Sequence, residues 1–68
     1  MKKYYVNKNA DAKSNHEVHV EGCPYSPRLE NRIDLGYFYN CEDAVRAAKK
    51  IYRIADGCNH CSKPCHTT

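Results

Sequence analysis

Three short segments of the chain predict β-strands, the first by its strand-forming Tyr4, Tyr5 and Val6 and the other two by alternation of hydrophobic and polar residues. The three segments are residues 3–8, 16–21 and 33–39. In the second segment Val18 and Val20 share one face, while His19 points to the opposite face with two glutamates. Pro24 and Pro27 lie between the second and third segments and indicate a loop rich in turns.

The third segment places Ile33, Leu35 and Tyr37 on one face of its predicted strand. We expect Tyr37 to fill the small core together with Tyr4 and Tyr5 from the first strand. The remaining tyrosines are then candidates for stacking on nucleic-acid bases: Tyr25, Tyr39 and Tyr52.

Helical periodicity follows the third strand. Asn40 is a suitable N-cap, and Glu42 and Asp43 place negative charge at the positive end of the helix dipole. The apolar face that would pack on the sheet consists of Ala44, Val45, Ala48, Ile51, Tyr52 and Ala55. Gly57 can adopt the left-handed conformation that ends many helices, so it predicts the C-terminal stop.

The order of these elements predicts an α+β fold in which a small three-stranded antiparallel sheet packs on one helix. A C-terminal cysteine-rich zinc knuckle, residues 57–66, follows the helix. Because no repeat or linker divides the sequence, residues 1–68 are expected to form a single zinc-stabilised domain.

The length of the chain makes extra stabilisation necessary. A domain of about 60 residues buries only about 60% of the surface that its unfolded chain exposes. The sequence has 68 residues and five cysteines, and it contains no apolar run near the length of a membrane span. Because Met1-Lys2-Lys3 leads directly into the first predicted strand, we expect no signal peptide. We therefore expect a cytoplasmic protein that is not inserted in a membrane. In the reducing cytoplasm, clustered cysteines more often bind metal than form disulfides.

The spacing of cysteine and histidine predicts one structural Zn²⁺ site. Such a site takes four nitrogen or sulfur ligands, usually as two local pairs from distant parts of the chain. Cys58 and Cys61 form one pair with two residues between them, and His19 and Cys23 form another at the end of the second strand. The predicted ligands are therefore His19, Cys23, Cys58 and Cys61.

Other residues compete for these roles. Cys65 or His66 lies close enough in sequence to replace the histidine ligand. Cys41 falls in the first turn of the predicted helix, where the dipole favours a thiolate, although a small buried side chain is the simpler interpretation. His16 and His60 are expected to face solvent. An isolated disulfide or free thiols remain the alternative for the cysteine pair.

A family resemblance is carried by three groups of residues: Val18-His19-x3-Cys23-Pro24-Tyr25, Tyr37-Phe38-Tyr39-Asn40-Cys41-Glu42-Asp43-Ala44, and Gly57-Cys58-x2-Cys61. They resemble the Ada-like metal-binding domain, including modules of some bacterial thermonuclease-type nucleases in which histidine replaces the first cysteine. The chain is also similar to a group of short bacterial proteins with the same cysteine arrangement. The resemblance implies a zinc-bound scaffold. Since His19 stands where the first cysteine pair begins, it does not extend to methyl transfer.

The charge pattern indicates possible partners. The formal net charge is +3, and four cations fall on the face of the predicted helix that points away from the sheet. These residues are Arg46, Lys49, Lys50 and Arg53. They are suited to salt-dependent contacts with phosphates, although such a face is often simply solvated.

We therefore expect a non-catalytic, monomeric zinc-binding module that binds nucleic acid or protein. The chain offers no catalytic constellation, membrane segment or small-molecule site. One alternative is a protein-interaction factor or inhibitor from a mobile element. Another is a disulfide or thiol-redox mini-protein without metal, although the cysteine pair follows a helix rather than opening one.

Overall fold

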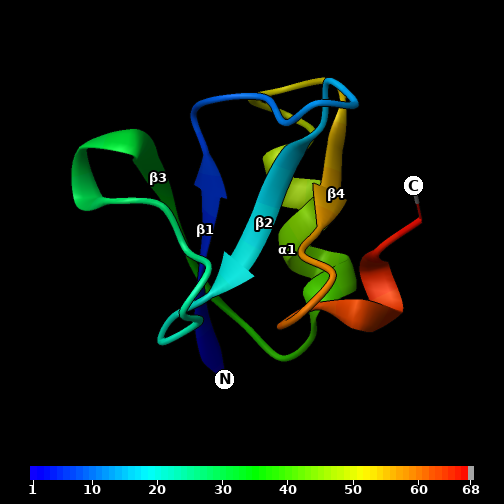
Figure 1. Cartoon of the computed structure of the whole chain (residues 1–68). Helices are drawn as coiled ribbons and strands as arrows, with labels where there is room; N and C mark the ends of the chain where they lie inside the picture. Colours follow the sequence, from blue (N-terminus) through cyan, green and yellow to red (C-terminus); the bar gives the residue numbers. More distant parts are fainter. Residues whose placement is uncertain (68) are drawn as a thin grey trace.

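The computed structural model describes residues 1–67. It consists of a mixed four-stranded sheet with one α-helix packed against it (Figure 1). In chain order the strands and the helix are β1 (Lys2–Asn7), β2 (His16–Val20), β3 (Arg32–Phe38), α1 (Cys41–Ala48) and β4 (Ala55–Gly57). Two short 3-10 turns are η1 (Leu29–Asn31) and η2 (Lys63–Cys65). The strand order is β3-β1-β2-β4.

The three predicted strands are confirmed as an antiparallel unit, with β1 between β2 and β3. The fourth strand was not predicted, and it pairs with β2 in the parallel direction. The expected three-stranded antiparallel sheet is therefore wrong in strand number and in being wholly antiparallel. Because β4 leads directly into the cysteine-rich segment, this extra strand decides where that segment lies.

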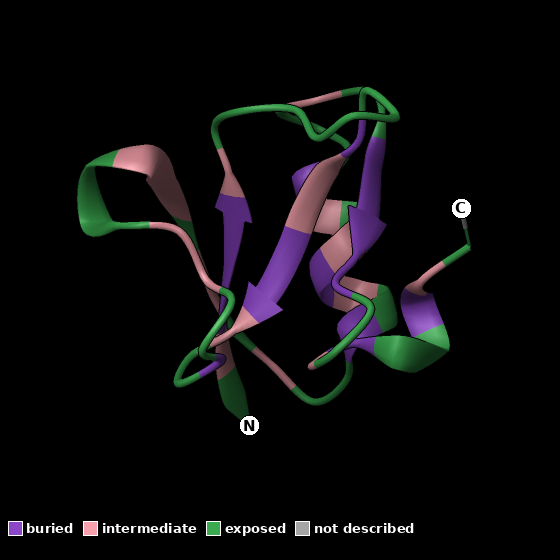
Figure 2. Cartoon of the chain, viewed as in Figure 1, coloured by how far each residue is buried: buried purple, intermediate pink, exposed green. Residues whose placement is uncertain are grey.

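The core lies between the sheet and α1 (Figure 2). Its buried members are Tyr4, Val6, Val18, Cys41, Ala44, Ala48, Ala55 and Cys65. Partly buried side chains around them are Val20, Ile33, Leu35, Phe38, Val45 and Tyr52. Several of these residues are alanines, which bury little apolar area, so additional crosslinks matter for this fold.

A bulge in β3 changes which aromatic side chains enter the core. The pairing of β1 with β3 shifts between Tyr4 and Tyr5, next to Gly36, whose φ is +94°. The extra residue reverses the alternation after the bulge. Phe38 therefore packs against the core, whereas Tyr37 is 59% exposed. The expectation that Tyr37 fills the core is wrong.

Helix α1 begins as predicted but ends earlier. The Asn40 side chain accepts a hydrogen bond from the Asp43 amide at 2.9 Å, which is the expected N-cap. After Ala48 the chain makes a turn in which the Ile51 amide donates to the Ala48 carbonyl. Ile51 is 49% exposed, so it does not lie on a buried helical face as predicted. Within residues 1–67, no helix has the length and apolar character to span a membrane.

Gly57 serves a different purpose from the predicted helix stop. It is the last residue of β4, and a Cβ atom there would lie 2.6 Å from the Cys65 Cβ and 2.7 Å from the Ser62 carbonyl oxygen. A glycine is needed because the C-terminal segment crosses the strand at this point. Ala55 is buried as expected, but in the sheet rather than on the helix.

Candidate metal centre

The structure brings together the four residues that the sequence predicts as metal ligands. One ligand atom from each of His19, Cys23, Cys58 and Cys61 lies within 4.8 Å of the others. His19, Cys23 and Cys58 are buried, and Cys61 is partly exposed. Three sulfur atoms and an imidazole nitrogen thus converge at one end of the sheet.

The parallel pairing of β2 with β4 explains why the two ligand pairs meet. Val18 of β2 lies opposite Gly57 of β4, and the Cys58 amide donates to the Val18 carbonyl at 2.9 Å. Cys58 therefore lies beside His19, the next residue of β2. Had the helix continued to residue 55 as predicted, this pairing would not exist.

Local turns then place the second ligand of each pair. The Cys23 amide donates to the Val20 carbonyl at 3.1 Å, and the turn passes through Gly22, whose φ is +93°. On the other side, the Ser62 amide donates to the Cys58 carbonyl at 3.0 Å, closing the turn that carries Cys61. Each pair is therefore held by one short turn, as is usual for structural zinc sites.

Backbone amides point at two of the sulfur atoms. The His60 amide donates to Cys58 Sγ at 3.3 Å, and the Val20 amide donates to Cys61 Sγ at 3.3 Å. Burial raises the pKa of the Cys61 thiol to about 12, while the Val20 amide acts in the opposite direction. Without a cation this thiol stays protonated, so a metal ion bound here has to displace its proton.

His19 has the properties of a metal ligand. The residue is 1% exposed, and burial lowers the pKa of its imidazole, which favours the neutral form that binds metals. Nδ1 lies 3.9 Å from Cys61 Sγ. In a tetrahedral zinc site with Zn–S bonds of about 2.3 Å, neighbouring sulfur atoms lie about 3.8 Å apart. The widest separation in the cluster, 4.8 Å, has to close by about 1 Å around an ion.

The donor set fits a metal ion that prefers soft ligands and tetrahedral geometry. Thiolates and imidazole suit zinc, whereas calcium and magnesium require oxygen ligands. Three cysteines with one histidine is an established structural zinc combination, and four protein ligands leave no open position for a substrate. The candidate site is thus suited to holding an ion rather than to using it in catalysis.

The alternative sulfur ligand, Cys65, is engaged elsewhere. It forms a disulfide with Cys41, with a Cα–Cα distance of 6.2 Å, which joins the first residue of α1 to η2. Cys41 is therefore neither a ligand nor an isolated buried thiol. The prediction that the cysteines bind metal rather than form disulfides therefore applies only to the three free cysteines, which are Cys23, Cys58 and Cys61. Because disulfides persist mainly in oxidising compartments, the cytoplasmic location stays a prediction.

His66, the other alternative, also lies away from the cluster. Its Nδ1 is 3.1 Å from the Gly57 carbonyl oxygen and 3.4 Å from an Asp56 carboxylate oxygen. The same carboxylate accepts bonds from the Thr67 amide at 3.0 and 3.1 Å and from the Thr67 hydroxyl at 2.8 Å. No sequence pattern predicts this arrangement, because Asp56 precedes the glycine that is expected to end the helix.

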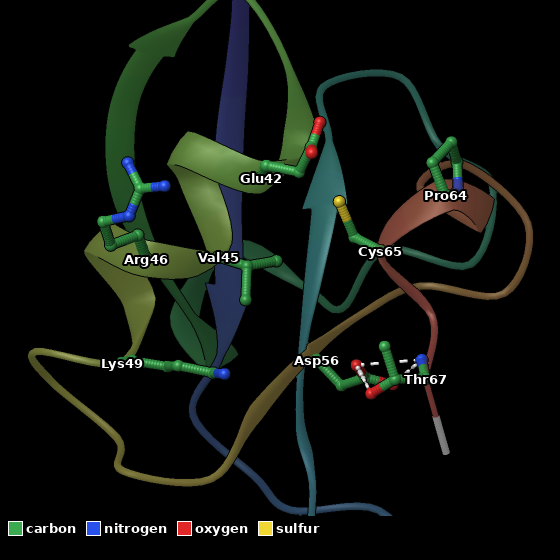
Figure 3. Close-up of a pocket in the computed structure, with 8 residues that line it drawn as sticks. All are labelled: Glu42, Val45, Arg46, Lys49, Asp56, Pro64, Cys65 and Thr67. Carbon is green, nitrogen blue, oxygen red and sulfur yellow. Dashed lines mark hydrogen bonds between the residues drawn. The ribbon is translucent and has the colours of Figure 1, made fainter.

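A pocket of about 330 Å³ lies between α1 and the C-terminal segment (Figure 3). Its lining residues are Glu42, Val45, Arg46, Lys49, Asp56, Pro64, Cys65 and Thr67. The pocket mixes two cations, two carboxylates and one sulfur of the disulfide, and it includes none of the four clustered ligands. It is therefore separate from the candidate metal centre.

The four predicted basic residues do not form one face of a helix, because α1 ends at Ala48. Arg46 pairs with Asp43 at 3.0 Å, so its charge is partly committed. Lys49 and Lys50 are exposed at the C-terminal end of α1, and Arg53 is exposed in the segment leading to β4. Among the described residues, these last three cations have no ion pair.

Two histidines stack on tyrosines. The His16 ring lies 3.8 Å from the Tyr52 ring with an interplanar angle of 4°, and its Nδ1 is 2.9 Å from the Asn7 carbonyl oxygen. The expectation that His16 simply faces solvent is therefore wrong. His60 is exposed as expected, and its ring stacks on Tyr25 at 3.9 Å.

Comparisons of the chain with protein-family models, with curated proteins and with solved structures find no match. The resemblance to Ada-like domains therefore stays a prediction.

Proposed function

We propose that this chain is a small zinc-binding module in which one Zn²⁺ has a structural, non-catalytic role. The observation that carries the proposal is the group of four nitrogen and sulfur ligands within 4.8 Å of one another. Its members are His19, Cys23, Cys58 and Cys61. Three of them are buried, which suits a permanent ion better than an exchanging one.

The position of the site supports a structural role. Its ligands follow or belong to β2 and β4, the only parallel pair in the described sheet. This pairing consists of three residue pairs, and so short a strand pairing is not stable by itself. A bound ion would hold the two strand ends together. Structural zinc contributes on the order of 10 kcal/mol or more to small folds, which is comparable to the whole stability of a typical domain.

A cobalt titration tests the proposal. Tetrahedral Co²⁺ with thiolate ligands absorbs strongly in the visible range, so titration of the metal-free, disulfide-intact chain should saturate at one equivalent, and one equivalent of Zn²⁺ should displace it. Cys61→Ser should weaken or shift this spectrum. The double variant Cys41→Ser/Cys65→Ser should leave it unchanged, because the disulfide is not part of the cluster. Absence of a tetrahedral spectrum in the unaltered chain would overturn the proposal.

We infer a second property, binding to nucleic-acid phosphates, from the cations that follow the end of α1. Lys49, Lys50 and Arg53 are exposed and have no ion pair within residues 1–67. Unpaired cations gathered on one exposed segment are suited to phosphate contacts with little sequence preference. The resemblance to Ada-like domains, which belong to a DNA-repair protein, supports the same partner class.

Fluorescence anisotropy with labelled single-stranded and double-stranded DNA and RNA tests this property. Binding should weaken as salt increases, and reversing Lys49, Lys50 and Arg53 to glutamate should reduce the salt slope by about one per lost phosphate contact. Reversal of three other exposed cations is the matched control: Lys8 and Lys13 in the β1–β2 connection, and Arg28 just before η1. No binding at low salt would exclude nucleic acid, and a stoichiometric protein partner would then be sought.

A further inference from the structure

The two ring nitrogens of His19 have different surroundings. Nδ1 faces the sulfur cluster and lies 3.9 Å from Cys61 Sγ. Nε2 lies on the other side of the ring, 3.6 Å from Glu17 Oε1. Nε2 is buried and has no hydrogen-bond partner among the described residues. If Nδ1 binds a metal, Nε2 carries the ring proton, and this buried N–H needs an acceptor.

Glu17 is placed to be that acceptor. It precedes His19 by two residues on β2, so both side chains project from the same face of the sheet. The Glu17 side chain is 30% exposed, which puts its carboxylate at the border between the buried ring and solvent. A small rotation about its side-chain bonds would shorten 3.6 Å to hydrogen-bond length.

We propose that Glu17 is a positioning residue for the zinc site, an inference that rests on the function proposed above. Its carboxylate accepts the Nε2–H of His19 and thereby holds the tautomer whose Nδ1 is free to bind the metal. In metal sites the second ring nitrogen of a histidine ligand commonly donates to a carboxylate, and this contact fixes the ring orientation and raises its basicity. Glu17 thus belongs to the site although it does not touch the ion.

Glu21 provides an internal comparison. It lies just beyond β2 and shares the alternation of Glu17 and His19, but its carboxylate accepts a hydrogen bond from the Tyr5 hydroxyl at 3.2 Å. The chain therefore offers two glutamates that flank the same histidine by two residues, and only Glu17 lies near its Nε2. Substitution of Glu21 is a matched control for substitution of Glu17.

The first experiment is NMR spectroscopy of the zinc-loaded, unaltered chain with ¹⁵N-labelled histidine. We expect His19 to show zinc on Nδ1 and a slowly exchanging proton on Nε2. Glu17→Gln should move this proton resonance, whereas Glu21→Gln should not. Zinc on Nε2 would overturn the inference and leave the proposed function standing. Failure of the chain to bind zinc at all would overturn both.

The second experiment measures zinc affinity by competition with a chromophoric chelator. Glu17→Leu should lower the affinity by about 10–100-fold, as is usual for loss of such a contact. Glu17→Gln keeps an acceptor oxygen and should recover most of the loss, while Glu21→Leu should match the unaltered chain. Equal affinities for Glu17→Leu and the unaltered chain would overturn the inference. If Glu17→Leu does not fold, the proton resonance in Glu17→Gln decides, because no change there also overturns it.

Discussion

The five cysteines are divided between a disulfide and the proposed metal crosslink, which lie in different parts of the molecule. Cys23, Cys58 and Cys61 join His19 in a mostly buried cluster where β2 and β4 end. The remaining pair forms a disulfide, with a sequence separation of 24, between α1 and η2. Under the proposed function, a metal ion in the cluster holds the ends of β2 and β4 together, whereas the disulfide fastens the segment that follows the sheet to the helix.

The two crosslinks are expected to differ in strength. A disulfide that closes a loop of this length contributes about 3–4 kcal/mol, chiefly by restricting the unfolded chain. A structural zinc ion contributes on the order of 10 kcal/mol or more. We therefore expect the metal to decide whether the chain folds, and the disulfide to add stability to a fold that the metal has already made possible.

Metal removal should have the largest effect. A strong chelator added to the disulfide-intact chain should abolish the cooperative thermal transition seen by circular dichroism, because loss of about 10 kcal/mol exceeds the stability of most small domains. Adding back Zn²⁺ should restore the transition. If the chelated chain keeps its cooperative melt at the same temperature, the cluster is not structural.

Cysteine substitutions in each crosslink sharpen the comparison. Cys58 is 1% exposed, and Cys58→Ser should leave the chain unfolded under conditions where the unaltered chain is folded. The double variant Cys41→Ser/Cys65→Ser should stay folded with zinc and lose about 3–4 kcal/mol in urea unfolding. A double variant that is as unstable as Cys58→Ser would reverse the ranking of the two crosslinks.

Gly57→Ala should act where the two crosslinks approach each other. The added methyl group would meet the Cys65 Cβ at 2.6 Å and the Ser62 carbonyl oxygen at 2.7 Å, so the C-terminal segment has to move. We expect a loss of about 1–3 kcal/mol, as for other overpacked sites. In the variant without the disulfide the loss should be smaller, since the segment is freer to shift. An equal loss in both backgrounds would show that the disulfide does not restrain this segment.

Asn40→Ala should give the smallest effect and only at the disulfide end. It removes the acceptor for the Asp43 amide at the start of α1 and should cost about 1 kcal/mol, measured by chemical denaturation with zinc present. Zinc affinity should not change, because Asn40 contributes no ligand. A parallel fall in zinc affinity would mean that the start of the helix and the metal centre are coupled.

The sequence was sufficient to predict the three longer strands, the N-cap and the two ligand pairs, because each depends on local alternation, capping or spacing. The fourth strand could not be predicted in this way. Helical spacing of apolar residues continues to Ala55, but α1 ends at Ala48. The strand at residues 55–57 depends on non-local pairing with β2, which the spacing does not reveal. The bulge at Gly36 likewise exchanges Tyr37 for Phe38 in the core through a pairing shift that alternation does not reveal.

The division of the cysteines was also beyond local patterns. Cys61 and Cys65 are close in sequence, and both lie within reach of a metal on spacing alone. The chain turns through η2 between them, so that Cys65 faces Cys41 while Cys61 faces His19. Disulfide connectivity in general cannot be deduced from cysteine spacing, because it depends on the completed fold.

Mass spectrometry tests the central claim most directly. Under native conditions the chain should carry one Zn²⁺, and after denaturation without reduction its mass should be two hydrogens below that of the fully reduced chain, matching the single disulfide between Cys41 and Cys65. A folded, metal-free chain whose denatured mass is four hydrogens below the reduced value would contradict the account. A second disulfide would then occupy the place assigned here to zinc.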